Sequence, residues 1–317
     1  MKLVFFDLEF SNCFSGIGKV CEFGYVMTDE NFKVLEEDVF VINPGNDREN
    51  RFFIDKNNKI DYSFWYYPIE YYYKQPEFPY FYERIKNILE GEDVIAFAYS
   101  SLNDVFHLES AIKRYDLKSL DYVCFDVQKF TRVLNFENKN PGLGTVANRI
   151  LKKETIESKR LHLSKDDAYI TMLVFKKLFE LSNSKLKDFL DLNKNYGIRT
   201  SKYFLEKEKI LKERIEREEV AKYYKEVIKN EQEILKNLKN PAKPAYFTRE
   251  LRFSRASINE LVSFARSKNM YLVDNPIDAE IIVYKDKNRL ERLLKNIEEK
   301  DYIIFEFDES KGMKLWI

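Results

Sequence analysis

Cysteine, histidine and long apolar runs are scarce in this sequence, and each scarcity excludes a class of protein. The 317 residues include three cysteines and two histidines. Three cysteines cannot form the disulfide framework of a small secreted domain, so we expect a reducing, cytoplasmic location. No apolar run approaches the roughly 18 residues of a membrane-spanning helix, and the N-terminus does not resemble a secretory signal. We therefore expect no membrane partner.

Net charge is absent as well, because 53 basic side chains balance 53 acidic ones. The two signs are unevenly distributed: residues 1–180 hold 24 basic and 29 acidic side chains, and residues 181–317 hold 29 basic and 24 acidic ones. A zero net charge argues against a polyanionic partner, but an acidic half joined to a basic half does not. The length predicts about two domains, and 44% hydrophobic residues suffice for a sizeable core.

Apolar patterning predicts a mixed α/β arrangement for the first half of the chain. Short apolar runs predict strands at residues 2–6, 20–27, 34–42 and 94–98. A turn signal at residues 28–31 joins the second and third of these strands as a hairpin. Helical spacing of apolar residues predicts helices at residues 82–89, 105–115 and 165–181.

The second half begins with a long charged helix. Residues 199–240 contain 12 Lys and Arg and nine Glu residues, no Pro or Gly, and a thin apolar seam. The seam fits packing within the monomer as well as pairing with another subunit. Beyond it, the pattern predicts a compact βαββαβ unit, with strands at residues 245–251, 270–273, 281–284 and 302–307 and helices at residues 257–267 and 289–299.

Acidic residues follow two of the predicted strands. Asp7 and Glu9 lie at the end of the first strand, and residues two apart in a strand point to one face, so both carboxylates project together. Hard divalent cations, which take oxygen ligands, neutralise such a pair. Asp104 follows the strand at 94–98 and opens a helix, where an ordinary helix cap is the simpler interpretation of this residue taken alone.

A third motif pairs one of the two histidines with an aspartate. His162 lies five residues before Asp167, at the start of the amphipathic helix expected at residues 165–181. An imidazole titrates near neutral pH and so suits proton transfer, and a purely structural histidine is the alternative. The other histidine, His107, lies within an expected helix, and we interpret it as a packing or solvent-facing residue.

The order of these motifs resembles the DEDDh family of 3′–5′ exonucleases, also called DnaQ-like or RNase T-like. A strand-borne D-x-E, an Asp that opens a later helix, and H-x4-D before another helix correspond here to Asp7 with Glu9, Asp104, and His162 with Asp167. The resemblance covers residues 1–182. It includes residues 21–26 (C-E-F-G-Y-V), which are similar to the family's second strand. It departs at Tyr99 and Ser100, where many members have His-Asn.

The resemblance implies a fold and a chemistry. The fold is α/β and ribonuclease H-like, with a mixed central sheet flanked by helices. The chemistry is hydrolysis of phosphodiester bonds from the 3′ end of single-stranded DNA or RNA, with His162 as general base. Two divalent cations, Mg²⁺ or Mn²⁺, would be held by Asp7, Glu9, Asp104 and Asp167. Contacts to the substrate are expected from Phe10, Ser11, Asn12, Tyr99 and Ser100.

Two alternatives stay open. Fourteen of the 49 aromatic residues fall within residues 52–82, where they either stack on the bases of a single strand or pack against the sheet. A chain that retains the fold without activity would be a nucleic-acid-binding or scaffold protein.

The expected organisation has three parts. These are an exonuclease domain at residues 1–182, a highly charged helical connector at 183–242 and a small α/β accessory domain at 243–317. The last resembles a BRCT domain in its βαββαβ order, but lacks the paired glycines after the first helix; a different accessory or docking domain is the alternative. A homodimer or a protein partner would bind through residues 199–240 or 243–317.

Overall fold

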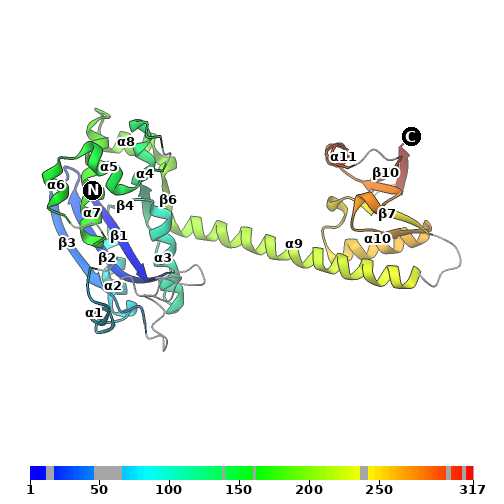
Figure 1. The fold of residues 1–317 in the computed structure, drawn as a ribbon, viewed down its shortest axis with the longest axis horizontal. Helices are drawn as coiled ribbons and strands as arrows, with labels where there is room; N and C mark the ends of the chain where they lie inside the picture. Colours follow the sequence, from blue (N-terminus) through cyan, green and yellow to red (C-terminus); the bar gives the residue numbers. More distant parts are fainter. Residues whose placement is uncertain are drawn as a thin grey trace. The chain divides into compact units, whose positions relative to one another are not determined.

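The chain forms two compact units, Met1–Glu206 and Lys207–Ile317, in a computed structural model (Figure 1). The structure describes residues 1–11, 18–45, 66–137, 140–159, 162–235, 242–297, 301–308 and 312–316. Among these residues, no helix combines the length and the hydropathy needed to cross a membrane.

The first unit is built on a six-stranded mixed sheet with the strand order β3-β2-β1-β4-β5-β6. The strands are β1 (Lys2–Ser11), β2 (Lys19–Asp29), β3 (Val34–Val41), β4 (Val94–Ala98), β5 (Val123–Asp126) and β6 (Gly197–Arg199). β2 is antiparallel to both β1 and β3, whereas β4 runs parallel to β1 and to β5. β6 closes the order antiparallel to β5.

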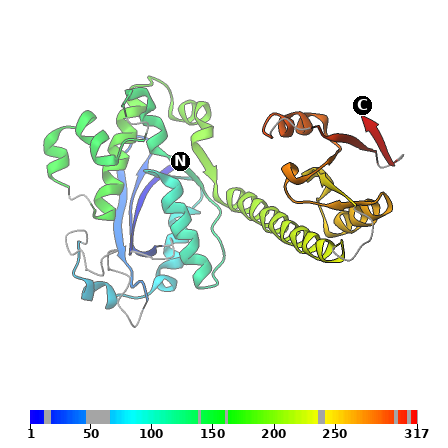
Figure 2. The same ribbon diagram turned by 45° about the vertical axis from the view of Figure 1, so that its right-hand side comes forward.

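Helices cover both faces of this sheet (Figures 1 and 2). They are α1 (Ile69–Tyr73), α2 (Phe78–Leu89), α3 (Ser101–Arg114), α4 (Val127–Phe130), α5 (Leu143–Ile150), α6 (Lys153–Glu157), α7 (Ser164–Glu180) and α8 (Leu186–Leu192). Short 3₁₀ turns lie at Thr131–Leu134 and Lys194–Tyr196. A mixed sheet with helices on both faces confirms the α/β fold class expected from the sequence.

Because side chains alternate along β1, its apolar residues belong to two hydrophobic cores, one on each face of the sheet. Val4, Phe6 and Leu8 are buried with residues of α2 and α3. Leu3 and Phe5 point to the opposite face and are buried with residues of α5, α7 and α8. Because strand side chains alternate, Asp7 and Glu9 continue the face of Leu3 and Phe5, which α7 covers.

Several elements differ from their expected bounds, and the difference matters at the site. The apolar run at residues 2–6 covers only the first half of β1, which continues past Asp7 and Glu9 to Ser11 because β2 pairs with it along this length. The helix expected from residue 105 begins at Ser101. The short strands β5 and β6 are not predicted, because four and three residues are too few to show a period.

Gly24 allows the N-terminus of α7 to lie directly against the sheet. It pairs with Asp7 across the β1–β2 ladder. A Cβ atom added at Gly24 would lie 2.1 Å from the backbone nitrogen of Lys165 and 2.2 Å from the carbonyl carbon of Ser164. No side chain fits there, so glycine at this position sets how closely α7 approaches β2.

The second unit contains a five-stranded sheet with the order β11-β10-β9-β7-β8. Its strands are β7 (Lys243–Phe247), β8 (Met270–Leu272), β9 (Ile281–Tyr284), β10 (Ile303–Asp308) and β11 (Gly312–Trp316), and its helices after α9 are α10 (Arg255–Ser267) and α11 (Lys287–Leu294). Two 3₁₀ turns lie at Arg249–Leu251 and Pro276–Asp278. The expected βαββαβ order is present, and β11 adds an antiparallel strand that the sequence did not predict. The BRCT-like resemblance stays a prediction.

The long charged helix is α9 (Thr200–Leu235), and it contributes to both cores. Near its start, Phe204 packs against the core of the first unit. Near its end, Tyr224 and Ile228 are buried in the core of the second unit, and Glu231 pairs with Arg266 of α10.

The middle of α9 lacks a continuous apolar face. Its apolar residues Leu205, Ile210, Leu211 and Ile215 are exposed; Leu211 and Ile215, one turn apart, share a face, but Ile210 lies on another. Ion pairs one turn apart, such as Arg214 with Glu218 at 2.9 Å, support this stretch instead. The expected seam is therefore packed against other residues where the helix joins each core, and its middle residues Leu211 and Ile215 are exposed.

We predict that Gly24→Ala lowers the free energy of unfolding of the first unit by about 3 kcal/mol or more, because the new methyl group would overlap the backbone of α7. Urea unfolding read by hydrogen exchange on peptides of residues 1–206 measures this. Gly142→Ala is the matched control: Gly142 has φ −67°, and a Cβ atom added there would have no heavy atom within 4 Å, so its change should stay within about 1 kcal/mol. Equal effects of the two substitutions would contradict the account.

Candidate active site

β1 extends beyond its parallel neighbour and carries two carboxylates into the space at the end of the sheet. The ladder with β4 pairs Lys2 with Val94 through Phe5 with Phe97. Asp7 and Glu9 lie past this ladder, but remain paired with β2, opposite Gly24 and Glu22. A register shift between Glu9 and Phe10 then changes the course of the strand.

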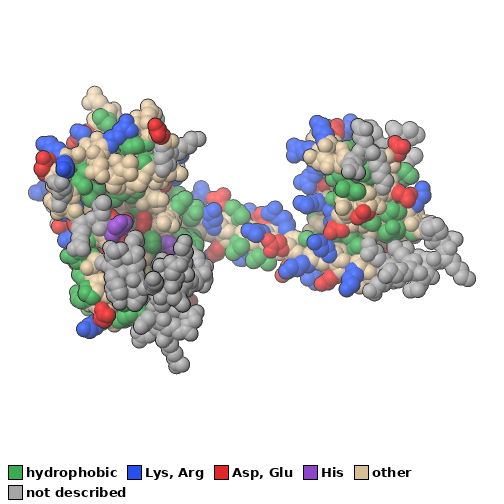
Figure 3. Space-filling view, viewed as in Figure 1, with side chains coloured by type: hydrophobic (Ala, Val, Ile, Leu, Met, Phe, Trp, Pro, Cys, Tyr) green, Lys and Arg blue, Asp and Glu red, His purple; other side chains and the backbone are tan. Residues whose placement is uncertain are grey.

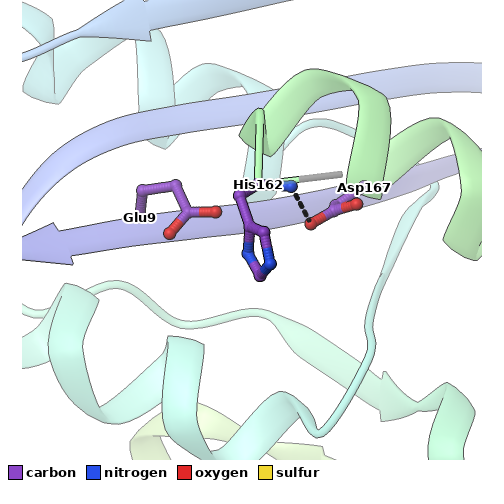
Figure 4. A group of neighbouring side chains, drawn as sticks. All are labelled: Glu9, His162 and Asp167. Carbon is purple, nitrogen blue, oxygen red and sulfur yellow. Dashed lines mark hydrogen bonds between the residues drawn. The ribbon is translucent and has the colours of Figure 1, made fainter. Parts of the chain in front are cut away.

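The start of α7 brings Asp167 and His162 to this pair. Asp167 lies in the first turn of α7 and is 9% exposed. The backbone amide of His162 donates a hydrogen bond of 3.2 Å to Asp167 Oδ2 (Figure 4). Glu9, His162 and Asp167 each offer an atom that lies within 4.8 Å of the others. The His162 side chain is exposed, and the space-filling view shows histidine and acidic side chains side by side on one face of this unit (Figure 3).

Asp104 joins the cluster from α3. It is 4% exposed, and the backbone amide of Leu8 on β1 lowers the pKa of its carboxyl group against the larger effect of burial. The helix-cap interpretation is wrong, because α3 begins at Ser101 and its N-cap position is Ser100. Ser100 has φ +60°, and its amide bonds to Asp126 Oδ1 at 3.1 Å. Asp104 is thus held inside the first turn and directed to β1.

Electrostatics show that the carboxyl groups share one environment. Burial, followed by the charges of Asp104, Asp167, Glu9 and Glu22, raises the pKa of Asp7 well above its ordinary value. Burial and the charges of Glu22, Asp167 and Asp104 raise the pKa of Glu9 to about 8. Burial raises the pKa of Asp167 to about 6, although His162 opposes the shift. The cluster therefore carries an excess of potential negative charge.

The donor atoms fit hard divalent cations. Carboxylate oxygens with one imidazole suit Mg²⁺ or Mn²⁺. The Oδ1 atom of Asp167 is buried and has no hydrogen-bond partner among the described residues. A buried carboxylate oxygen without a partner is costly unless a cation or a donor satisfies it. Asp7, Glu9, Asp104 and Asp167 are the residues that could hold such an ion.

Glu22 is a member of this cluster that the sequence motifs do not include. It lies on β2 opposite Glu9 and is fully buried. The available signal was a charged residue within the otherwise apolar stretch at residues 20–27. The strand pairing that places it beside Glu9 cannot be derived from that stretch alone.

The residues expected to contact substrate have varied surroundings. The ring of Phe10 packs against that of His107, with centroids 4.0 Å apart, so this histidine has the packing role. Ser11 is 1% exposed, and Asn12 lies outside the described residues. Tyr99 is buried, and its hydroxyl donates to the carbonyl of Pro141 at 2.6 Å. Only Ser100 of the described members of this set is exposed.

Nine of the fourteen clustered aromatic residues lie within the described part of the chain. Four of them are buried, namely Tyr72, Phe78, Phe81 and Tyr82. Three are exposed, namely Tyr66, Tyr71 and Tyr80. Packing against the sheet therefore accounts for the buried members.

Comparisons with known proteins return similar folds among solved structures. No family model matches the sequence, and no curated protein matches it either. The nuclease domain of 3′hExo, a DEDDh family member bound to rAMP, has 12% identity and a TM-score of 0.44, covering 58% of this chain and 93% of its own.

Two further solved structures are exonucleases with DNA. Exonuclease I of E. coli, in a zinc-bound complex with single-stranded DNA, has 15% identity and a TM-score of 0.46, covering 60% of this chain and 43% of its own. Exonuclease X with 5′ overhanging duplex DNA has 14% identity and a TM-score of 0.40, covering 59% and 95%. At these values the likeness concerns the fold, and any assignment of function rests on the side chains described above.

We predict that, when a chelator removes divalent cations, the free energy of unfolding of the first unit falls as the pH rises from about 5 to 8. The folded-state pKa values of Glu9 and Asp167, about 8 and about 6, lie above those of the unfolded chain. The folded state therefore binds more protons than the unfolded state, through Glu9 up to about pH 8 and through Asp167 up to about pH 6. While a group is in its range, it lowers the free energy of unfolding by up to about 1.4 kcal/mol per pH unit. Urea unfolding at several pH values measures the slope.

Glu9→Gln should flatten this slope and leave the chelated protein more stable than the wild type at pH 8, because one buried charge is removed. An unchanged slope in Glu9→Gln would contradict the assignment of the pH dependence to this cluster.

Proposed function

We propose that this protein is a metal-dependent 3′–5′ exonuclease that hydrolyses phosphodiester bonds at the 3′ end of single-stranded DNA or RNA. The observation that carries the proposal is a convergence in space. Asp7 and Glu9 of β1, Asp104 of α3, and His162 with Asp167 at α7 are far apart in sequence, yet they form one electrostatic cluster. These are the residues that the ordered DEDDh-like motifs selected.

The four aspartate and glutamate side chains would hold the cations. When bound, two divalent cations supply an activated water and neutralise charge on the leaving oxygen. Asp7 and Glu9 are rigidly placed, since β1 is paired with β2 on either side of them. Asp167 accepts a hydrogen bond from the backbone amide of His162, and Asp104 lies in the first turn of α3.

His162 would take the proton from the attacking water. Its imidazole is exposed and lies beside Glu9 and Asp167, where both cation and substrate would approach. Its φ of +66° is unusual for a residue with a side chain, and the bond from its amide to Asp167 stabilises this conformation. The backbone that carries the proposed base is thus tied to a proposed cation ligand.

The substrate class follows from the chemistry of the cluster. The first half of the chain is acidic, so bound cations would supply the attraction for a polyanion. A general base beside a carboxylate cluster serves hydrolysis of a phosphodiester bond, and a free 3′ end is what the family resemblance implies. DNA and RNA are distinguished by contacts to the 2′-hydroxyl, so both are tested.

The test uses 5′-labelled single-stranded DNA and RNA with the full chain and Mn²⁺. We predict metal-dependent shortening from the 3′ end, which His162→Ala lowers by about 10² to 10⁴ and Asp104→Asn by at least as much. Asp166→Asn is the matched control: it removes a neighbouring carboxylate that pairs with Lys159 at 3.3 Å, and activity should stay within about fivefold.

Two results would contradict the proposal. Shortening that is equal in the wild type and in both cluster variants would assign the activity to a contaminant or another site. An unshortened substrate that is nevertheless bound would favour a nucleic-acid-binding scaffold that retains the fold.

A further inference from the structure

Glu22 presents a problem that the proposed chemistry does not explain. Its side chain is fully buried on β2, and it lies directly opposite Glu9 in the β1–β2 ladder. Burial raises its pKa, and hydrogen bonds to its carboxylate oppose that shift. A carboxyl group in this position costs free energy unless its oxygens are fully satisfied.

Both oxygens of Glu22 accept hydrogen bonds from other elements. The hydroxyl of Tyr72 on α1 donates to Oε1 at 2.5 Å. The hydroxyl and the backbone amide of Ser164 donate to Oε2 at 2.9 and 3.3 Å. Three donors therefore converge on one side chain, and none of them belongs to β2.

The contact with Ser164 gives α7 a cap that its own sequence lacks. Ser164 is the first residue of α7, and the N-cap residue Leu163 provides no side-chain hydrogen bond. The first amides of a helix need acceptors, and a carboxylate at this end also complements the helix dipole. Glu22 supplies that acceptor from the adjacent strand.

The capped turn is the one that carries the proposed cation ligand and base. Ser164 lies two residues after His162 and three before Asp167. Gly24, two residues along β2, leaves room for the backbone of Ser164 and Lys165. Glu22 attracts the helix terminus to the strand, and Gly24 determines how closely it approaches.

We propose that Glu22 is a positioning residue, which holds the N-terminus of α7 so that Asp167 and His162 meet Asp7 and Glu9. The inference rests on the proposed function, in which Asp167 holds a cation. Tyr72 shares the role: its ring is fully buried with Cys21, Val41 and Ile69, and its hydroxyl orients the Glu22 carboxylate.

The test is a titration of the full chain with Mn²⁺, following the electron paramagnetic resonance signal of the free ion. Glu22→Ala should weaken Mn²⁺ binding about 10- to 100-fold, as loss of a partner that orients a ligand does. Glu22→Gln should stay within about threefold of the wild type, because its amide oxygen can accept from Ser164 and its amide nitrogen can donate to Tyr72.

Two milder variants control for the possibility that Glu22→Ala weakens Mn²⁺ binding by misfolding. Ser164→Ala and Tyr72→Phe each remove one hydroxyl donor, and each should weaken binding less than Glu22→Ala. Combining either with Glu22→Ala should add no further loss, because both act through Glu22. In the metal-free protein, hydrogen exchange of the peptide at residues 162–170 should be at least tenfold faster in Glu22→Ala and near wild type in Glu22→Gln.

Three outcomes overturn the inference. Equal weakening by Gln and Ala would make Glu22 a ligand or a charge rather than a positioning residue. Unchanged Mn²⁺ affinity in a folded Glu22→Ala variant would show that α7 is placed without it. A wild type that binds no Mn²⁺ would remove the proposed function and this inference with it, a result distinct from the other two.

Discussion

The burial of several carboxyl groups beside one another at the end of β1 is the constraint on which the first unit depends. Burial raises the pKa of Asp7, Glu9, Glu22, Asp104 and Asp167, and the charges of neighbouring cluster members add to the shift at Asp7, Glu9 and Asp167. Such a cluster opposes folding above about pH 5 unless positive charge compensates it. Two divalent cations would do so, and they would also reverse the sign of the field that a nucleic acid meets.

The local geometry of β1, β2 and α7 determines where these carboxyl groups lie. Alternation along β1 directs Asp7 and Glu9 to the face that α7 covers, and Gly24 lets α7 start against that face. The backbone amide of His162 donates to Asp167, and Asp104 is buried in the first turn of α3. The site thus draws its precision from the strand and helices that carry its residues and from the backbone of the turn before α7, as a preorganised site should.

The parts of the site that could be predicted from the sequence are those with a local signature. The patterns D-L-E on a strand and H-x4-D before a helix define both the residue types and the direction of the side chains within a few positions. The residues that they predict, Asp7, Glu9, His162 and Asp167, do come together in one cluster. Glu22 was missed because its role depends on pairing with Glu9 and on donors 50 and 142 residues away. The contact of the Phe10 ring with the His107 ring joins β1 to α3, and no pattern within a few neighbouring residues predicts it. For the same reason β5 and β6, which are defined by their neighbours, were not predicted.

The central claim is that the carboxylate cluster is a cation site, and the dependence of stability on Mn²⁺ tests it most directly. At pH 7.5, the free energy of unfolding of the first unit should rise by about 2.7 kcal/mol when free Mn²⁺ reaches about 100 times its dissociation constant. Asp7→Asn should begin more stable than the chelated wild type, because it removes a repelled charge, and should gain little from Mn²⁺. A wild-type stability that does not change with Mn²⁺, or an equal gain in Asp7→Asn, would contradict the account.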